Sequence, residues 1–214
     1  MSYINVLFAV ILMFAAGRGT SDEDQARLHG VAQDIWHAAD VLDPPLIVGD
    51  GGKGTLATAL VLTTVAGHES GFWSKVQDCS ACWKGSPFCD KGRSVSIFQL
   101  HVGSGAWGGF SRQEICESNA VASKLALGIL ARHRRAGSAL ALFQGYALGG
   151  RRQAAGEMAA MWVMAARKAR LVLRPNPARA VPGHVGPAVP VLAAEWAPGQ
   201  KPPEPDPEPN APDA

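Results

Sequence analysis

Apolar residues along the chain recur mainly at helical spacing. After Ser21 and Asp24, which are placed as in a capping box, they fall three or four positions apart from Leu28 to Leu42. Similar spacing over residues 119–135, from residue 138 onward and over residues 152–173 predicts further helices. The sequence therefore predicts one mainly α domain over residues 21–174, with little or no strand.

One apolar stretch, residues 55–67, is a nearly continuous run of Leu, Val, Ala and Thr. The run is too long for an ordinary strand and too short to cross a bilayer, so it predicts a largely buried helix over residues 55–68. Glu69 then stands at the C-terminal end of this helix, where the negative end of the helix dipole disfavours an ionised carboxylate. We therefore expect Glu69 to be held protonated, as a general acid requires at neutral pH.

The two ends of the chain differ in composition from its middle. Residues 1–17 hold an apolar core followed by small residues, which is typical of a secretory signal, although a short anchor or an ordinary buried segment has the same pattern. Residues 175–214 are rich in Pro and acidic residues and hold almost no apolar residue after Trp196. This composition predicts a disordered tail.

Charge favours an anionic partner without identifying it. Residues 1–174 hold eighteen Lys and Arg against thirteen Asp and Glu, and a basic body attracts anionic polymers of several kinds. The clusters at residues 132–135 and 151–152 are typical of solvated helix ends, where cations suit the dipole. We therefore expect no nucleic acid partner.

The four cysteines are Cys79, Cys82, Cys89 and Cys116. A C-x2-C start can indicate zinc, but no second such pair and no His at ligand spacing follow. Together with the export-like start, this favours two disulfides over a zinc site. A link between Cys79 and Cys82 would close a very tight loop, so each of them is expected to pair with Cys89 or Cys116, and either combination stays open. No metal and no cofactor are expected.

Two catalytic motifs can be excluded around Glu69. His68-Glu69 begins the zinc-protease pattern H-E-x-x-H, but Phe72 stands where the second His is needed. Ser70 does not lie in a G-x-S-x-G elbow, which excludes that class of serine hydrolase. A lone carboxylate remains, and a Glu at a helix end is often simply solvated.

Three segments in order change that balance. They are E-S-G-F at residues 69–72, S-I-F-Q at 96–99 and A-L-F-Q-G-Y-A-L-G-G at 141–150. On these segments, residues 55–150 resemble the lytic transglycosylase and lysozyme-like superfamily of peptidoglycan-cleaving enzymes. The sequence departs from the family at Ser96, where Gly is usual, and at Phe143-Gln144, where the family has Tyr-Asn; Tyr146 is the nearest phenol.

The resemblance implies a lysozyme-like helical fold and a set of site residues. Glu69 would be the catalytic acid and base on the bond between N-acetylmuramic acid and N-acetylglucosamine, and substrate would be bound by Ser70, Ser96, Gln99 and Tyr146. In the transglycosylase mechanism the sugar's own 6-hydroxyl captures the cleaved residue, so no second carboxylate is required. Products would then end in 1,6-anhydromuramic acid.

A hydrolytic muramidase is the alternative within the same family. It would need a second carboxylate near Glu69, and the sequence offers Asp78 and Asp90 without a motif that identifies either. Trp73, Trp83 and Trp107 are candidate sugar-stacking faces, although each fits plain packing equally well.

The remaining alternative is a non-catalytic module that binds peptidoglycan or serves as a structural protein of an envelope or phage particle. In every case the expected partner is the glycan strand, with envelope or phage structural proteins as further partners, and the oligomeric state is unknown. The expected location is outside the cytoplasm, in the periplasm or cell envelope, or on a phage particle that acts there.

Overall fold

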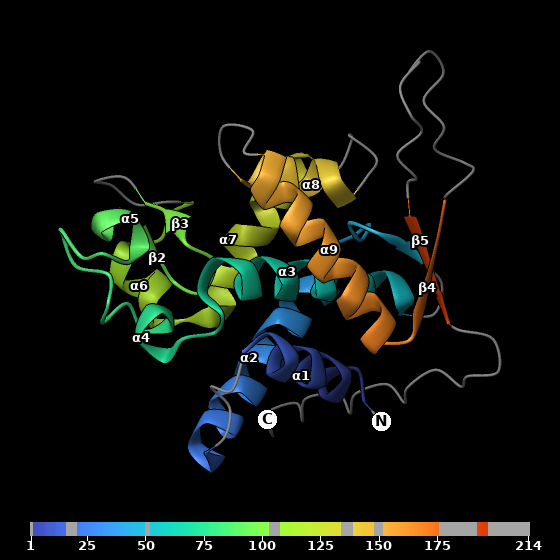
Figure 1. Cartoon of the computed structure of the whole chain (residues 1–214), viewed down its shortest axis with the longest axis horizontal. Helices are drawn as coiled ribbons and strands as arrows, with labels where there is room; N and C mark the ends of the chain where they lie inside the picture. The colour runs from blue at the N-terminus through green and yellow to red at the C-terminus, as the bar shows by residue number, and fades with distance from the viewer. Residues whose placement is uncertain are drawn as a thin grey trace, which may run out of the picture.

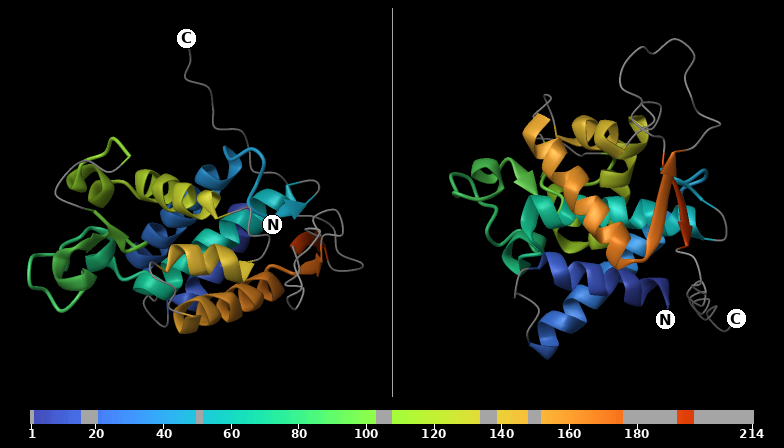
Figure 2. Two further views of the ribbon diagram at one scale, coloured as in Figure 1. Left: turned by 90° about the horizontal axis from the view of Figure 1, so that it is seen from above. Right: turned by 45° about the vertical axis from the view of Figure 1, so that its right-hand side comes forward.

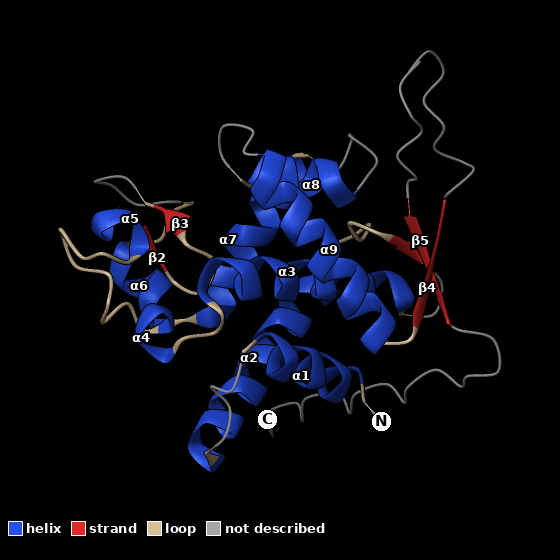
Figure 3. Ribbon diagram, viewed as in Figure 1, coloured by secondary structure: helices blue, strands red, loops and turns tan. Residues whose placement is uncertain are grey.

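The computed structural model describes residues 2–15, 21–49, 52–102, 108–133, 139–147, 152–175 and 192–196. Most of these residues are helical and only short stretches are strand, as Figure 3 shows. The prediction of a mainly α protein with little strand is therefore confirmed.

Helix α3, Lys53–Ser70, lies at the centre of the fold (Figure 1). Helices α1 (Tyr3–Phe14), α2 (Asp22–Asp40), α7 (Asn119–Arg132) and α9 (Arg152–Lys168) all contact it. Every residue of α3 from Leu56 to Ala66 is buried, because a helix that is apolar all round needs neighbours on every side. The predicted buried helix is confirmed and is two residues longer at each end.

Helix α1 is packed into the body of the protein. Leu7, Val10 and Ile11 are fully buried, and α1 contacts both α2 and α3. The ring of Tyr3 stacks on that of Trp36 with 4.8 Å between centroids. The apolar N-terminal residues thus form part of the core here, as in the buried-segment alternative. None of the helices in the described part of the chain is long and apolar enough to cross a membrane.

Serine residues cap two of the helices, and the cap at Ser21 was predicted from sequence. Ser21 caps α2, and its Oγ accepts a hydrogen bond from the Asp24 backbone N–H at 3.1 Å. Ser118 caps α7, and its Oγ accepts from the Val121 N–H at 3.3 Å. Each cap satisfies a backbone donor that the helix itself leaves unpaired.

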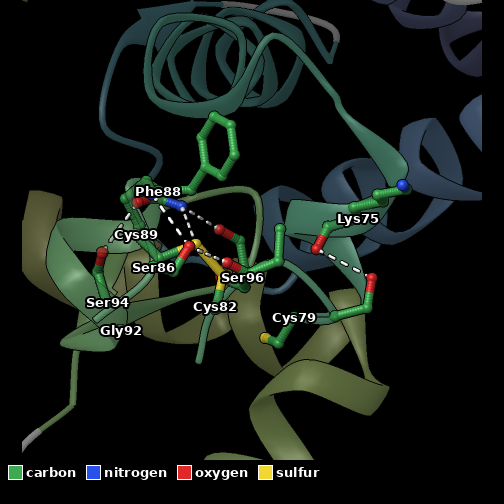
Figure 4. Close-up of a disulfide and its surroundings, with 12 residues drawn as sticks. Lys75, Cys79, Cys82, Ser86, Phe88, Cys89, Gly92, Ser94 and Ser96 are labelled. Atoms are coloured by element: carbon green, nitrogen blue, oxygen red, sulfur yellow. Dashed lines mark hydrogen bonds between the residues drawn. A yellow bond between two sulfur atoms is a disulfide. The ribbon is translucent and has the colours of Figure 1, made fainter. Parts of the chain in front are cut away.

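Residues 73–93 form a lobe on one side of the body, with short helices α4 (Ser74–Gln77) and α5 (Cys89–Gly92). One disulfide joins Cys79 to Cys116 on α6 (Arg112–Glu117), and a second joins Cys82 to Cys89 (Figure 4). The expected two disulfides are confirmed. In the described ranges no group of three or more His, Cys, Asp or Glu could hold a metal ion.

The lobe has its own small core and is tied to the rest of the protein by Arg112. Val76, Ala81, Cys82 and Cys89 are buried together under Trp73. The Arg112 guanidinium donates to the carbonyl oxygens of Gly92 at 3.0 Å and Cys82 at 2.5 Å. These hydrogen bonds attach the lobe to α6, next to the hairpin that follows the lobe in the chain.

That hairpin and the helices after it complete the body. Strands β2 (Ser94–Val95) and β3 (Leu100–His101) pair antiparallel. Helix α8, Ala139–Tyr146, then packs against α7 and α9. The hairpin and the ends of α3, α7 and α8 meet at one place, which is the candidate site described below.

A three-stranded sheet lies on the side opposite the lobe (Figure 2). Its order is β1 (Val48–Gly49), β5 (Leu192–Trp196) and β4 (Leu171–Pro175), with β5 parallel to β1 and antiparallel to β4. Two predictions are corrected by this sheet. The helix expected to reach residue 173 ends at Lys168, because Arg170 takes a φ of 60° and a strand follows. Part of the tail expected to be disordered, residues 192–196, is a strand.

A candidate active site at the end of helix α3

A cavity of about 650 Å³ opens between the C-terminal end of α3, the β2–β3 hairpin and helices α7, α8 and α9. Glu69, Gln99 and Tyr146 all line it. These three residues come from the three separate segments identified in the sequence. The fold therefore brings one side chain from each segment to the same cavity.

Glu69 is positioned by the way α3 ends. Gly71 adopts a left-handed conformation with φ 53°, and its N–H donates to the Gly67 carbonyl at 2.9 Å, a helix end that favours glycine. Phe72 follows and is fully buried. The side chain of Glu69, 24% exposed, is thus held in the last turn of a buried helix, and the Phe72 that follows this turn is anchored in the core.

Ser70 closes the helix and does not line the cavity. Its Oγ donates to the Ala66 carbonyl at 2.8 Å and accepts from the Phe72 N–H at 3.1 Å. Both bonds satisfy backbone groups at the helix end. The structure therefore gives Ser70 a part in shaping the turn after Glu69, outside the cavity lining.

Ser96 is also kept from the cavity. It is fully buried in the hairpin turn with φ 65°, and its Oγ accepts from the Phe98 N–H at 3.3 Å. Ile97 and Phe98 on either side of the turn's centre are fully buried and pin it to the core. The structure therefore places Ser96 outside the cavity lining, with its hydroxyl bonded within the turn.

Gln99 reaches the cavity with its amide group already oriented. Its Oε1 accepts from the Ser94 hydroxyl at 2.8 Å. Its Nε2 donates to the Ser96 carbonyl at 3.2 Å and makes a longer contact of 3.6 Å with the sulfur of Cys89. The hairpin and a disulfide cysteine together fix the side chain, so that it meets a ligand in one orientation.

Tyr146 joins α8 to the hairpin. Its hydroxyl donates to the Phe98 carbonyl at 2.5 Å. Burial raises the pKa of the Tyr146 phenol well above its usual value, and the negative charge of Glu69 raises it further. Tyr146 therefore stays protonated at neutral pH and acts as a hydrogen-bond donor to the backbone of the second segment.

The two carboxylates named as partners for Glu69 have different positions. Asp90 lines the cavity, and its Oδ2 lies 2.7 Å from Nε2 of His101, which also lines it. Asp78 is not part of the lining, and its Oδ1 accepts from the Ser80 N–H at 2.8 Å. Only Asp90 shares the cavity with Glu69.

His68 lies beside Glu69 in the cavity wall. Its Nε2 is 3.2 Å from Oε2 of Glu157 on α9, with hydrogen-bond geometry, and its Nδ1 is 3.4 Å from Oε1 of Glu69. The second contact is an ion-pair contact, since Nδ1 has no hydrogen-bond partner among the described residues. The pKa of His68 is raised, mainly by Glu69, against the effect of burial and with help from Glu157.

Basic residues from two other elements also line the cavity. Arg93 comes from the end of the lobe, and Arg132 and His133 come from the end of α7. Gly145 of α8 lies so close to His133 that a Cβ there would be 2.1 Å from Cγ of the ring. Glycine at this position therefore lets the end of α7 approach α8.

Two of the tryptophans proposed to stack on sugars, Trp73 and Trp83, lie outside the cavity lining. Trp73 packs edge-on against Phe88 with 4.8 Å between ring centroids. Trp83 and Phe88 are 58% and 44% exposed on the lobe, and Figure 4 shows the Phe88 ring standing clear of the disulfide. Trp107 lies outside the described residues.

Sequence reasoning missed several residues of this cavity, among them His68, Arg93, His101 and His133. His68 was considered only as half of a zinc motif, and the arginines of α7 only as a solvated helix end. A usable signal existed for His68, because it directly precedes Glu69. The others are brought in by packing between distant segments, which the sequence pattern does not encode.

Comparison with known proteins adds no relative. The chain matches no protein-family model, no curated protein and no solved structure.

Proposed function

We propose that this protein is a peptidoglycan-degrading glycosidase in which Glu69 is the general acid and base. The observation that supports the proposal best is the shared cavity: Glu69, Gln99 and Tyr146, named from three separate segments of sequence, all line it. A volume of about 650 Å³ is in the range of ligand-binding sites.

The proposed reaction is that of a lytic transglycosylase. Glu69 donates a proton to the glycosidic oxygen between N-acetylmuramic acid and N-acetylglucosamine, and the bond from that oxygen to C1 of the muramoyl residue breaks. Positive charge develops at C1 and the ring oxygen. The ionised Glu69 then accepts the proton of the 6-hydroxyl, whose oxygen bonds to C1, so that the muramoyl residue leaves as the 1,6-anhydro sugar.

Gln99 and Tyr146 have different roles in this proposal. The amide of Gln99 is fixed by Ser94 and Ser96 and lines the cavity, which suits contact with an acetamido or hydroxyl group of the sugar. The hydroxyl of Tyr146 is already used by the Phe98 carbonyl. Tyr146 is therefore a positioning residue that holds the Gln99 hairpin against α8.

A hydrolytic muramidase is the second candidate, and Asp90 is the observation that favours it. This carboxylate lines the same cavity as Glu69 and is held by His101. A hydrolase would use such a group to stabilise the charged intermediate or to activate water. The two candidates differ in product, because hydrolysis leaves a reducing muramic acid end.

Mass spectrometry of peptidoglycan digested with the purified protein tests both candidates. A transglycosylase yields 1,6-anhydromuramic ends, which are lighter by one water than reducing ends. Glu69→Gln should lower the rate by about a hundredfold to ten-thousandfold, the usual worth of a general acid or base. Glu23→Gln, which changes an exposed carboxylate on α2, is the matched control and should keep full activity.

Each outcome decides between the candidates. The hydrolase is supported if the unaltered protein produces reducing muramic acid ends and the Asp90→Asn protein does not. A folded Glu69→Gln protein that digests peptidoglycan at the normal rate contradicts both, and binding without cleavage by the unaltered protein supports the non-catalytic module.

A further inference from the structure

The charged groups in the cavity are unevenly paired. Both carboxylates of its lining have a histidine beside them, since Glu69 lies 3.4 Å from His68 and Asp90 lies 2.7 Å from His101. Among the described residues, no ion pair joins a carboxylate to Arg93 or Arg132, which line the same cavity. Two guanidinium groups are thus left facing the space that a ligand would occupy.

Arg93 is fixed at its base and open at its end. Its backbone N–H and its Nε both donate to the Asp90 carbonyl, at 3.3 Å and 3.1 Å. This turn depends on Gly92, because a Cβ there would lie 2.3 Å from the Trp83 carbonyl oxygen. The turn therefore leaves the terminal nitrogens of Arg93, on an exposed side chain, available to a ligand.

Arg132 approaches from another element. It is the last residue of α7 and is exposed. A cation at this position also suits the helix dipole, but that effect alone does not require the side chain to line the same cavity as Arg93. Two guanidinium groups from separate elements around one cavity are suited to a carboxylate, which each of them can bind with two parallel hydrogen bonds.

We propose that Arg93 and Arg132 form an anion subsite that binds a carboxylate on the muramoyl side chain of the substrate. This inference rests on the proposed function and narrows it. The cavity would select peptidoglycan over neutral β-1,4 polymers of N-acetylglucosamine, which have the same backbone but carry no carboxylate. The carboxylate is either that of the lactyl group or one in the stem peptide attached to it.

Calorimetric titration of the Glu69→Gln protein tests the subsite without turnover. Two ligands of equal length are compared, a chitin tetrasaccharide and a peptide-free tetrasaccharide of alternating N-acetylglucosamine and N-acetylmuramic acid. We expect the second to bind about tenfold more tightly, as for a hydrogen-bonded charge pair. Adding Arg93→Gln or Arg132→Gln should remove most of this preference and leave the affinity for chitin unchanged.

Arg167→Gln is the matched control. It removes the same charge from an exposed position on α9 that does not line the cavity, so the preference should persist. A salt titration of the Glu69→Gln protein is an independent measurement, because the preference for the charged ligand should fall as salt screens the subsite.

Two further ligands identify the source of the carboxylate. In one the lactyl group is linked to alanine amide and carries no charge, and in the other it carries a stem peptide with free carboxylates. If the peptide-free ligand binds tightly and the ligand with the alanine amide does not, the subsite binds the carboxylate of the lactyl group. Tight binding that needs the charged peptide assigns the stem.

Two results would overturn the subsite. One is equal affinity of the Glu69→Gln protein for chitin and for both charged ligands. The other is a preference for the charged ligand that persists in both Arg93→Gln and Arg132→Gln. The proposed glycosidase stands in either case if the unaltered protein cleaves peptidoglycan and Glu69→Gln does not. Conversely, the unaltered protein can fail to cleave peptidoglycan while the preference for the charged ligand still depends on Arg93 and Arg132. That result supports the subsite and contradicts the proposed glycosidase.

Discussion

His68 Nε2 lies 3.2 Å from Oε2 of Glu157, and this contact joins α3 to α9 beside the cavity. Glu69 lies on the other side of the same imidazole, 3.4 Å from Nδ1. A histidine between two carboxylates is stabilised in its protonated form. The candidate acid is therefore next to a histidine whose pKa is raised above its usual value.

The stability of the protein should depend on pH through this pair. Because the pKa of His68 is raised in the folded state, its contribution to the free energy of unfolding is fully present below the unfolded pKa of about 6.5 and is lost as pH rises through the folded pKa. Glu157→Gln should therefore lower the melting temperature more at about pH 5.5 than at about pH 8.5, on either side of that value.

Gln153→Ala is the control for this measurement. Gln153 Nε2 donates to Oε1 of Glu157 at 3.0 Å but has no titrating group, so its loss should lower the melting temperature about equally at both pH values. An equal effect of Glu157→Gln at both values would contradict the linkage to His68.

Tyr146→Phe should destabilise the protein without removing its packing. The substitution leaves the buried ring in place but takes the donor from the Phe98 carbonyl, and a buried acceptor left unpaired costs about 1–3 kcal/mol. Denaturant unfolding measures this loss. Since Tyr146 is assigned a positioning role, the variant should cleave peptidoglycan slowly, with anhydro ends still present; complete inactivity of the folded variant argues instead for a direct part in the chemistry.

The two disulfides should contribute differently to stability. The Cys79–Cys116 link spans 37 residues and the Cys82–Cys89 link spans 7, for which loop-closure entropy gives about 4 and about 2 kcal/mol. Cys79→Ala with Cys116→Ala should therefore lower the free energy of unfolding by more than Cys82→Ala with Cys89→Ala. The reverse order would mean that the short link supports the lobe in some other way.

Removal of the short disulfide should reduce activity more than removal of the long one, the opposite of the order expected for stability. Cys89 contacts Gln99 and directly precedes Asp90, which lines the cavity. Loss of the Cys82–Cys89 link should therefore reduce cleavage at a temperature where both double variants remain folded. Circular dichroism at the assay temperature checks that condition.

Gly67→Ala should disturb the contact between α1 and α3. A Cβ at Gly67 would lie 2.9 Å from Cδ2 of Phe14, so the Phe14 ring has to move. We expect a loss of about 1–3 kcal/mol from overpacking. Gly128→Ala in α7 is the matched control, because nothing lies within 4 Å of its added Cβ, and better helix propensity should make it neutral or stabilising.

Much of the helical framework follows from local pattern, and the sheet does not. The continuous apolar run of α3 requires burial on all sides, and Ser21 caps the helix that it was expected to cap. Strand β5 pairs with β4 and β1 across long separations in a Pro-rich region. Composition predicts disorder in this region. It does not reveal strand pairing, which depends on partners elsewhere in the chain.

The candidate site was predictable only in part. Glu69, Gln99 and Tyr146 lie in motif segments and do line the cavity, whereas Ser70 and Ser96 lie in the same segments and do not. The difference is in their hydroxyls, which are bonded within the helix end and the hairpin turn. A sequence pattern does not reveal whether a serine serves the backbone or a ligand.

The contact of Phe14 with Gly67 also affects how the protein should be produced for any assay. Residues 1–17 have the composition of an export signal, so trimming them is a natural choice when the gene is expressed. Yet α1 covers α3 up to the turn that carries Glu69. A trimmed protein loses the support of that turn, and its inactivity would report a damaged scaffold and say nothing about the carboxylate. The chain with α1 and the trimmed chain should therefore be compared before any result from Glu69→Gln is interpreted.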